Sequence, residues 1–280
     1  MAMFNKIVII GVGLIGGSIG LAVKKQRLAK EVVGICRRPS SCRKALHKKA
    51  CDIATMDYNE GLRNADFVII ATPVGKIIDI AKDVINNSAG DMILIDVGST
   101  KEILVKEIEK ITPKRIKFIG THPMAGSEKS GVQVASAGLF RNSICIITKT
   151  KNSDNKAVSL VKKFWEKLGV RCLFLSPLKH DYYMSFASHL PHAVCMALAA
   201  TVSPDIIKYT STGFKDSTRI ALSDPHLWKD IFMTNRIALL KAIRKYKHIL
   251  GRFEKSIRMK DSKKLMSILE RAKRTRDMVS

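Results

Sequence analysis

One short stretch near the N-terminus constrains the fold of this 280-residue chain more than any other. A run of branched apolar residues leads directly into the pattern Gly11-x-Gly13-x-x-Gly16, and an apolar segment with helical spacing follows. This order predicts a buried strand, a tight turn and the first turn of a helix, with Gly13 leaving room for a pyrophosphate and Gly16 letting helix pack on strand. The helix N-terminus would offer N–H groups and a positive dipole end to the phosphates. We therefore predict a dinucleotide-binding turn formed by Gly11, Gly13, Leu14, Ile15 and Gly16.

Strand-like and helix-like patterns alternate after this turn, which predicts βαβ units and a parallel sheet. Near-continuous apolar runs, such as residues 67–71, fit strands that are covered on both faces. The predicted strands are residues 6–10, 32–36, 52–55, 67–71, 92–97, 116–120, 144–148 and 171–175. The predicted helices between them are residues 14–26, 76–85, 101–111 and 155–168.

The pattern changes at Ser176-Pro177, a favourable N-cap and first position for a helix. Only helical periodicity follows, and Pro191 should kink the first long helix. Residues 227–257 repeat apolar side chains at helical spacing over many turns, as a helix does when it buries a face against another chain. The predicted fold class is α/β: a Rossmann-type doubly wound sheet in residues 1–175 and an all-helical domain in residues 176–280 through which the chain forms a homodimer.

Composition narrows the classes of protein that fit. The chain is 46% apolar and 26% charged, which is ordinary for a globular protein, and its apolar runs are too short for a transmembrane helix. We see no signal peptide, and six scattered cysteines without a Cys-x-x-Cys motif suit reduced packing residues in the cytoplasm and no metal site. The net charge of +25 is spread along the chain and is densest in residues 236–280, where fifteen Lys and Arg face four Asp and Glu. Because no nucleic-acid motif accompanies this charge, we expect it to attract anionic small molecules rather than nucleic acid.

The end of the second predicted strand bears on the choice of cofactor. An NAD site usually places Asp or Glu about 20 residues beyond the glycines, where it bonds the ribose 2′-hydroxyl. Cys36 occupies this position, and Arg37, Arg38 and Ser41 follow it. These side chains could pair with a 2′-phosphate, so we favour NADP and leave NAD open. Because ligands sit beyond the carboxyl ends of strands, we expect Thr72, Pro73 and Val74 to line the same site.

Candidate chemical groups follow the sixth strand and recur in the helical half. His122 comes at the end of a strand, in a loop rich in Gly, Pro and Ser, and a neutral imidazole there could accept a hydroxyl proton as hydride leaves the same carbon. His189 and His192 are three residues apart and share a helix face, which suits a substrate wall better than a metal pair without a third ligand. Arg219 could hold a carboxylate, or form a structural ion pair with Asp216 or Asp224.

Together these motifs resemble the prephenate/arogenate dehydrogenase family of tyrosine biosynthesis. The resemblance covers roughly residues 5–260. After the generic glycine turn it rests on six more specific motifs in one order: Ala71-Thr-Pro-Val-Gly75, Asp96-Val-Gly-Ser-Thr-Lys101, Gly120-Thr-His-Pro-Met-Ala-Gly126, Ser188-His-Leu-Pro-His192, Gly213-Phe-Lys-Asp-Ser-Thr-Arg219 and Asp224-Pro-His-Leu-Trp228.

The resemblance implies oxidative decarboxylation of prephenate, or of arogenate, with NAD or NADP as hydride acceptor. His122 matches the family's catalytic histidine, which binds the ring hydroxyl, and Ser99 matches a serine that bonds the same hydroxyl and the histidine. Arg219 matches the arginine that holds a substrate carboxylate, and His192 matches a histidine of the substrate site. Glu128 matches an acidic residue near the site entrance. We also expect His189 and Ser127 to contribute to substrate binding.

Two other classes of protein remain as alternatives. One is another two-domain reductase that acts on an imine or a β-hydroxyacid, although such enzymes usually depend on a lysine of the helical domain. The other is a non-enzymatic Rossmann protein that senses nucleotides or binds nucleic acid through the basic C-terminal region. Turnover of prephenate or arogenate separates both alternatives from the dehydrogenase.

Overall fold

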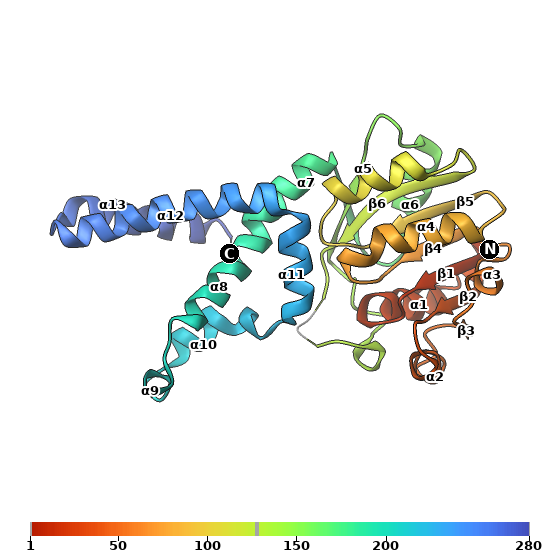
Figure 1. Ribbon diagram of the computed structural model, residues 1–280, viewed down its shortest axis with the longest axis horizontal. Coiled ribbons are helices and arrows are strands. Elements are labelled where there is room, and N and C mark those ends of the chain that lie inside the picture. The colour runs from red at the N-terminus through yellow and green to blue at the C-terminus, as the bar shows by residue number, and fades with distance from the viewer. Residues whose placement is uncertain (1, 127–128, 280) are drawn as a thin grey trace. The chain divides into compact units, whose positions relative to one another are not determined.

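The computed structural model describes residues 2–126 and 129–279, and the chain divides into two compact units, Met1–Asn235 and Arg236–Ser280. An eight-stranded sheet forms the centre of the first unit, with the strand order β3-β2-β1-β4-β5-β6-β7-β8 (Figure 1). The strands are β1 (Phe4–Ile10), β2 (Ala29–Ile35), β3 (Ile53–Thr55), β4 (Phe67–Ile70), β5 (Met92–Asp96), β6 (Ile116–Pro123), β7 (Ile144–Thr148) and β8 (Arg171–Leu175). Every strand predicted from the sequence is present, with ends shifted by at most three residues.

Alternate residues of the central strands face opposite sides of the sheet and form two separate apolar cores. Ile7 and Ile9 belong to one core, whereas Val8 and Ile10 belong to the other. Helices α1 (Leu14–Gln26), α2 (Pro39–His47) and α6 (Asn155–Lys167) contribute to the first core. Helices α3 (Tyr58–Leu62), α4 (Ile77–Asn87), α5 (Glu102–Ile111) and α11 (Pro225–Thr234) contribute to the second. Coverage of both faces explains why the strands are apolar throughout.

The sheet is parallel except between β6 and β7, which are antiparallel. The prediction of a parallel sheet therefore fails at this one pairing. A parallel return needs a crossover that spans the sheet, usually a helix. In its described part, the connection from β6 to β7 contains only the short 3₁₀ helix η2 (Val132–Val134).

The antiparallel pairing also corrects the predicted position of His122. We expected this residue in a loop, but it lies within β6, where it pairs with Ile146 of β7. The neighbouring pairs, Thr121 with Ile147 and Pro123 with Cys145, extend β6 beyond its parallel partner β5. A Gly- and Pro-rich sequence can continue a strand here because a second strand supplies the partners.

The register of the parallel strands sets which residues meet at the carboxyl edge of the sheet. Ile10 of β1 pairs with Ile70 of β4, Ile70 pairs with Asp96 of β5, and Asp96 pairs with Gly120 of β6. The residues that directly follow this row therefore emerge along one edge. Because β1 and β4 are neighbours, the strand order also reverses between them, which is where doubly wound sheets bind ligands.

Helices follow β8 without a further strand in the described part of the chain. The segment at Pro191 is distorted as predicted: a π-helix, η3 (Ser185–His189), separates α7 (Pro177–Met184) from α8 (Leu190–Ala200). Proline has no N–H for the helical ladder, and a π-turn relieves the resulting clash. The remaining short elements are η1 (Val74–Lys76), α9 (Pro204–Ile207), α10 (Thr212–Thr218) and η4 (Arg219–Leu222).

The single long helix expected over residues 227–257 is wrong. The segment forms α11, which ends at Thr234, and α12 (Arg236–Arg258) of the second compact unit. Asn235 interrupts the helix, and its buried side chain makes hydrogen bonds that fix a non-helical backbone there. In the second unit, α12 lies beside α13 (Ser262–Asp277) (Figure 1).

The α/β fold class with a helical C-terminal part is confirmed. All six cysteines are free thiols. No helix among the described residues is long and apolar enough to cross a membrane. The division at residues 175 and 176 separates the sheet from the helices, and it stays a prediction. The boundary between the compact units falls later in the chain, after Asn235, because α7 packs on α5 and α11 packs on η1 within the first unit.

Candidate functional site

The β1–α1 turn has the shape that a dinucleotide needs. Gly11 has φ +91°, a left-handed conformation that favours glycine, and a Cβ there would lie 2.7 Å from the carbonyl oxygen of Ala71. At Gly16 a Cβ would collide with the carbonyl oxygen of Gly11. At Gly13, by contrast, a Cβ would meet nothing within 4 Å, so open space lies beside this residue.

Two further features of the turn fit a bound pyrophosphate. No described side chain caps the N-terminus of α1, and its first turn has no acidic residue, so the N–H groups of Leu14 and Ile15 face a site suited to an anion. Across the switch point, the buried hydroxyl of Thr72 has no hydrogen-bond partner among the described residues. Thr72 leads through Pro73 into Val74, the first residue of η1. The residues present therefore fit a dinucleotide beside β1 and β4.

The end of β2 carries two arginines near the position where an NAD site usually has an Asp or Glu that bonds the ribose. Cys36 is buried, and burial raises the pKa of its thiol to about 12, so it stays uncharged. Arg37 and Arg38 are exposed and form no ion pair with any described residue. Ser41 lies partly exposed in the first turn of α2, where its N–H donates to the carbonyl of Arg38.

We expect substitutions at two glycines of the turn to have different effects, one on stability and the other on cofactor affinity. Gly16→Ala forces a Cβ against backbone, and such overpacking lowers the free energy of unfolding by about 1–3 kcal/mol. Gly13→Ala is the matched variant, because its Cβ enters open space: stability should change by less than about 1 kcal/mol while dinucleotide affinity falls. Chemical denaturation and calorimetric titration with NAD and NADP measure the two quantities. Unchanged affinity in Gly13→Ala would exclude this turn as the phosphate site.

A buried ion pair anchors the turn between β5 and α5. Lys101 and Asp96 are both fully buried, and Lys101 Nζ lies 2.6 Å from Asp96 Oδ2. The same ammonium donates to the carbonyls of Gly98 at 2.7 Å and Thr100 at 2.8 Å. These bonds hold the backbone on both sides of Ser99, whose side chain is partly exposed. Burial raises the pKa of Asp96, and the adjacent Lys101 opposes that shift.

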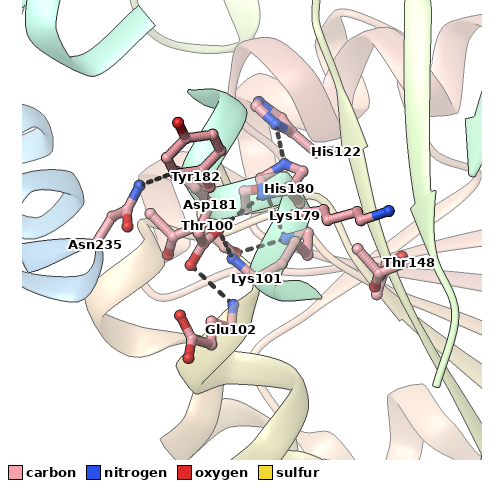
Figure 2. A network of polar contacts seen from close by, with 12 residues as sticks. Thr100, Lys101, Glu102, His122, Thr148, Lys179, His180, Asp181, Tyr182 and Asn235 are labelled. Carbon is pink, nitrogen blue, oxygen red and sulfur yellow. Dashed lines mark hydrogen bonds and ion pairs between the residues drawn. The ribbon is translucent and has the colours of Figure 1, made fainter. Parts of the chain in front are cut away.

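Asp181 of α7 caps the helix that begins at this turn (Figure 2). Its Oδ1 accepts the N–H of Lys101 at 2.7 Å, and its Oδ2 accepts the N–H of Glu102 at 2.9 Å. The backbone carbonyl of Asp181 accepts a bond of 2.8 Å from Nδ2 of Asn235. One residue thereby ties α7 both to α5 and to the end of α11.

His122 meets this group through His180 (Figure 2). His122 Nδ1 lies 2.8 Å from His180 Nε2, and His180 Nδ1 lies 2.7 Å from Asp181 Oδ1. Burial lowers the pKa of His122 well below 6.5, and the neighbouring His180, Lys101 and His189 lower it further. Burial also lowers the pKa of His180, to about 2. Both imidazoles are therefore neutral at physiological pH, and a neutral His122 can accept a proton.

His189 and His192 share a helix face, as predicted, and both contact Trp228 of α11. His192 stacks on the indole, with ring centroids 3.4 Å apart and planes inclined by 20°. The two histidines differ in exposure: His192 is half-buried, whereas His189 is 1% exposed and its Nδ1 lies 3.0 Å from Asn235 Nδ2. The indole supports His192 as part of a surface, and His189 is held within the core beneath it.

The structure does not join the remaining predicted residues to the group around His122. No hydrogen bond joins Ser99 to His122 in the described parts of the chain, where His122 Nδ1 is engaged by His180 instead. Arg219, at the start of η4, is exposed and forms no ion pair with Asp216 or Asp224. Its helical turn packs on α8, which carries His192. Ser127 and Glu128 lie outside the described residues.

Sequence reasoning missed His180, Asp181 and Asn235, which lie behind His122, and it named Lys101 in a motif without predicting that this lysine is buried. A signal for two of them was present: His180-Asp181 lies in the first turns of a helix that the cap at Ser176 already located. Nothing in the local sequence indicated that this helix would bring His180 to His122 of β6. No three His, Cys, Asp or Glu side chains among the described residues are grouped to hold a metal ion.

Burial of neutral histidines predicts acid sensitivity. The pKa of His189 falls from 6.5 to about 4 on burial, so below pH 6.5 the unfolded chain binds a proton that the folded chain does not. Stability is therefore full above pH 6.5 and declines as the pH falls toward 4, by about 1 kcal/mol per pH unit from this one residue. His189→Asn keeps an acceptor for Asn235 and removes the titration. Urea denaturation between pH 7 and pH 5 should give a shallower loss in the variant, and equal slopes would contradict the buried neutral state. The buried carboxyl groups are present in both proteins, so their contribution largely cancels.

Comparisons with known proteins agree with this geometry. The family model "Prephenate dehydrogenase, nucleotide-binding domain" matches residues 19–174, and "Prephenate dehydrogenase, dimerization domain" matches residues 176–271. The prephenate dehydrogenase of Bacillus subtilis is 33% identical, over 98% of this chain and 76% of the relative. The cyclohexadienyl dehydrogenase of Zymomonas mobilis is 30% identical, over 99% of this chain and 96% of the relative.

A solved structure extends the likeness to three dimensions. The prephenate dehydrogenase of Aquifex aeolicus, in complex with hydroxyphenyl propionate and NAD+, superposes with a TM-score of 0.92 at 35% identity. The match covers 99% of this chain and 98% of that one. The chain belongs to the prephenate dehydrogenase family of enzymes.

Proposed function

We propose that this protein is a prephenate dehydrogenase, which converts prephenate to 4-hydroxyphenylpyruvate and carbon dioxide with a nicotinamide dinucleotide as hydride acceptor. The observation that carries the proposal is the register row at the carboxyl edge of the sheet, Ile10–Ile70–Asp96–Gly120. Two residues beyond that row, β6 presents His122, on the edge where β1 enters the glycine turn. A proton acceptor on the same sheet edge as a dinucleotide turn suits the removal of a hydroxyl proton and a hydride from one carbon.

In the proposed reaction, His122 holds the hydroxyl of ring carbon C4 and takes its proton as hydride leaves that carbon. The electron pair of the bond between C1 and its carboxylate then enters the ring, and carbon dioxide departs. The oxygen on C4 regains the proton from His122 as the ring becomes aromatic. The bound nicotinamide supplies the hydride acceptor. Because aromatisation drives the reaction, the protein mainly has to orient the substrate and hold one proton.

Further residues are proposed to bind substrate and cofactor. Arg219 would pair with a substrate carboxylate, because it is exposed and no described carboxylate holds it. The half-buried His192 would form part of the substrate wall on Trp228, and Ser99 would bond the ring hydroxyl. Arg37, Arg38 and Ser41 favour a 2′-phosphate, so we propose NADP ahead of NAD, although the Aquifex structure holds NAD+.

We also propose a homodimer through the helical C-terminal part. The family model that matches residues 176–271 is a dimerization domain. Within the second compact unit, α12 exposes several large apolar side chains that a partner would cover. The most exposed are Ile237 at 64%, Ile257 at 56% and Leu250 at 53%.

One assay grid tests the function. Turnover is measured with prephenate and with arogenate, each with NAD and with NADP, by the absorbance of the reduced nicotinamide. Prephenate turnover supports the proposal, and preference for arogenate would reassign the substrate within the family. Absence of turnover in all four combinations would refute it.

His122→Asn should lower kcat for prephenate by about 10²–10⁴, the usual contribution of a general base. Asparagine cannot take the hydroxyl proton, although it can still form a hydrogen bond. Steady-state kinetics on the folded variant, with its thermal midpoint as the control for folding, measure the effect. Near-normal turnover would remove His122 from the mechanism.

Arg219→Ala should act on binding rather than on chemistry. Loss of a charge-assisted pair costs about 1.5–3 kcal/mol, so KM for prephenate should rise by about 10- to 100-fold with a smaller change in kcat. Lys215→Ala is the matched control, because it removes an exposed cation from the same segment. An equal rise in KM in both variants would indicate general electrostatic attraction instead of a specific pair.

A further inference from the structure

We propose that Asp181 and His180 are positioning residues that hold His122 in a single tautomer, with hydrogen on Nδ1 and a lone pair on Nε2. The inference rests on the proposed function only in giving that lone pair a substrate proton to accept. It assigns a role to two residues that no sequence motif used above contains.

The argument begins at the carboxyl group of Asp181, whose two oxygens accept backbone N–H groups of Lys101 and Glu102. Backbone N–H groups only donate, so both oxygens serve as acceptors. The group also lies at the N-terminus of α5, where the positive end of the helix dipole favours an anion. Asp181 is therefore a carboxylate. Burial raises the pKa of Asp181, while the two backbone hydrogen bonds and the nearby Lys101 oppose that shift and stabilise the ionised form.

A carboxylate fixes the proton of His180. An ionised carboxylate can only accept, so His180 Nδ1, which lies 2.7 Å from Asp181 Oδ1, carries the hydrogen. A neutral imidazole has one N–H and one lone pair, so His180 Nε2 is an acceptor. The low pKa of His180 excludes the doubly protonated ring at physiological pH.

The same rule then fixes His122. Its Nδ1 faces the lone pair of His180 Nε2 at 2.8 Å, and two lone pairs at that distance would repel, so His122 Nδ1 carries the hydrogen. Its second ring nitrogen points away from His180 in Figure 2 and has no partner among the described residues. This Nε2 holds the lone pair that a general base needs. Without Asp181, nothing in the pair of imidazoles would favour hydrogen on both Nδ1 atoms over hydrogen on both Nε2 atoms.

The direct test is the tautomer of His122 in the ligand-free, full-length protein. Nitrogen-15 labelling of histidine and a long-range proton–nitrogen spectrum distinguish a protonated from a bare ring nitrogen, and the spectrum of His122→Asn assigns the signals. We expect hydrogen on Nδ1 in both His122 and His180. Hydrogen on Nε2 of His122 would overturn the proposal.

Two substitutions of His180 separate positioning from packing. His180→Gln places Oε1 near the former Nε2, so it still accepts from His122, whereas His180→Leu fills similar volume without an acceptor. We expect His180→Leu to lower kcat for prephenate by about 10²–10⁴ and to change KM by less than about threefold. His180→Gln should retain kcat within about tenfold of the wild type and keep hydrogen on His122 Nδ1. Equal kcat values in the two variants would contradict the positioning role of His180.

Asp181→Asn tests whether the carboxylate of Asp181 sets the two tautomers. A second variant controls for the change at the helix cap. An amide that donates to His180 Nδ1 reverses both tautomers, so kcat should fall and hydrogen should move to His122 Nε2. Asp154→Asn makes the same exchange of a capping carboxylate for an amide, at the start of α6, and should leave the tautomers unchanged. If Asp181→Asn does not fold, the wild-type spectrum and the His180 variants still decide the matter. If the wild type fails to oxidise prephenate, the proposed function is refuted, while the spectrum still tests the tautomer of His122.

Discussion

The fully buried pair of Lys101 and Asp96 is the interaction on which the site depends most. A charge without water is stable only when it is paired and hydrogen-bonded, and here the ammonium has one carboxylate and two carbonyl partners. Those bonds fix the turn that contains Ser99 and start α5 at a defined residue. Removing one member would leave an uncompensated charge in the core, with a cost of about 3–5 kcal/mol.

The same turn also positions the helices that follow the sheet. Asp181 caps α5, which brings α7 against the carboxyl edge and His180 against His122. The same residue holds Asn235, whose amide also contacts His189. The base, the cap and the break between α11 and α12 thus belong to one hydrogen-bonded group. Such a group is cooperative, so a change in one member alters the protonation and position of the others.

Much of the fold could be predicted from the sequence because its signals are local. The glycine turn, the apolar strands and the cap at Ser176 depend on residues adjacent in the chain, and these elements are confirmed. The predictions that failed depend on partners distant in sequence. β6 continues through His122 because β7 pairs with it, and the helix breaks at Asn235 because Asp181 and His189 hold that side chain.

In the candidate site, too, the residues with local sequence signals could be predicted and those defined by distant contacts could not. His122 and the glycine turn could be found from motifs, because each lies at the end of a recognisable strand. His180 and Asp181 could not be assigned, because their roles come from contacts across 58 and 80 residues of sequence. A buried lysine is likewise invisible in a sequence, where lysine usually indicates a solvated surface.

The place of His122 within a β-ladder has an energetic consequence for the enzyme. A base on a loop would lose backbone freedom each time a substrate arrived, and part of the binding energy would go into ordering it. A base on a strand that is paired with a neighbouring strand, as His122 is with β7, has already lost that freedom when the chain folds. The entropy of ordering His122 is therefore lost once, during folding. Substrate binding energy stays available to orient the reacting ring toward the base and the nicotinamide.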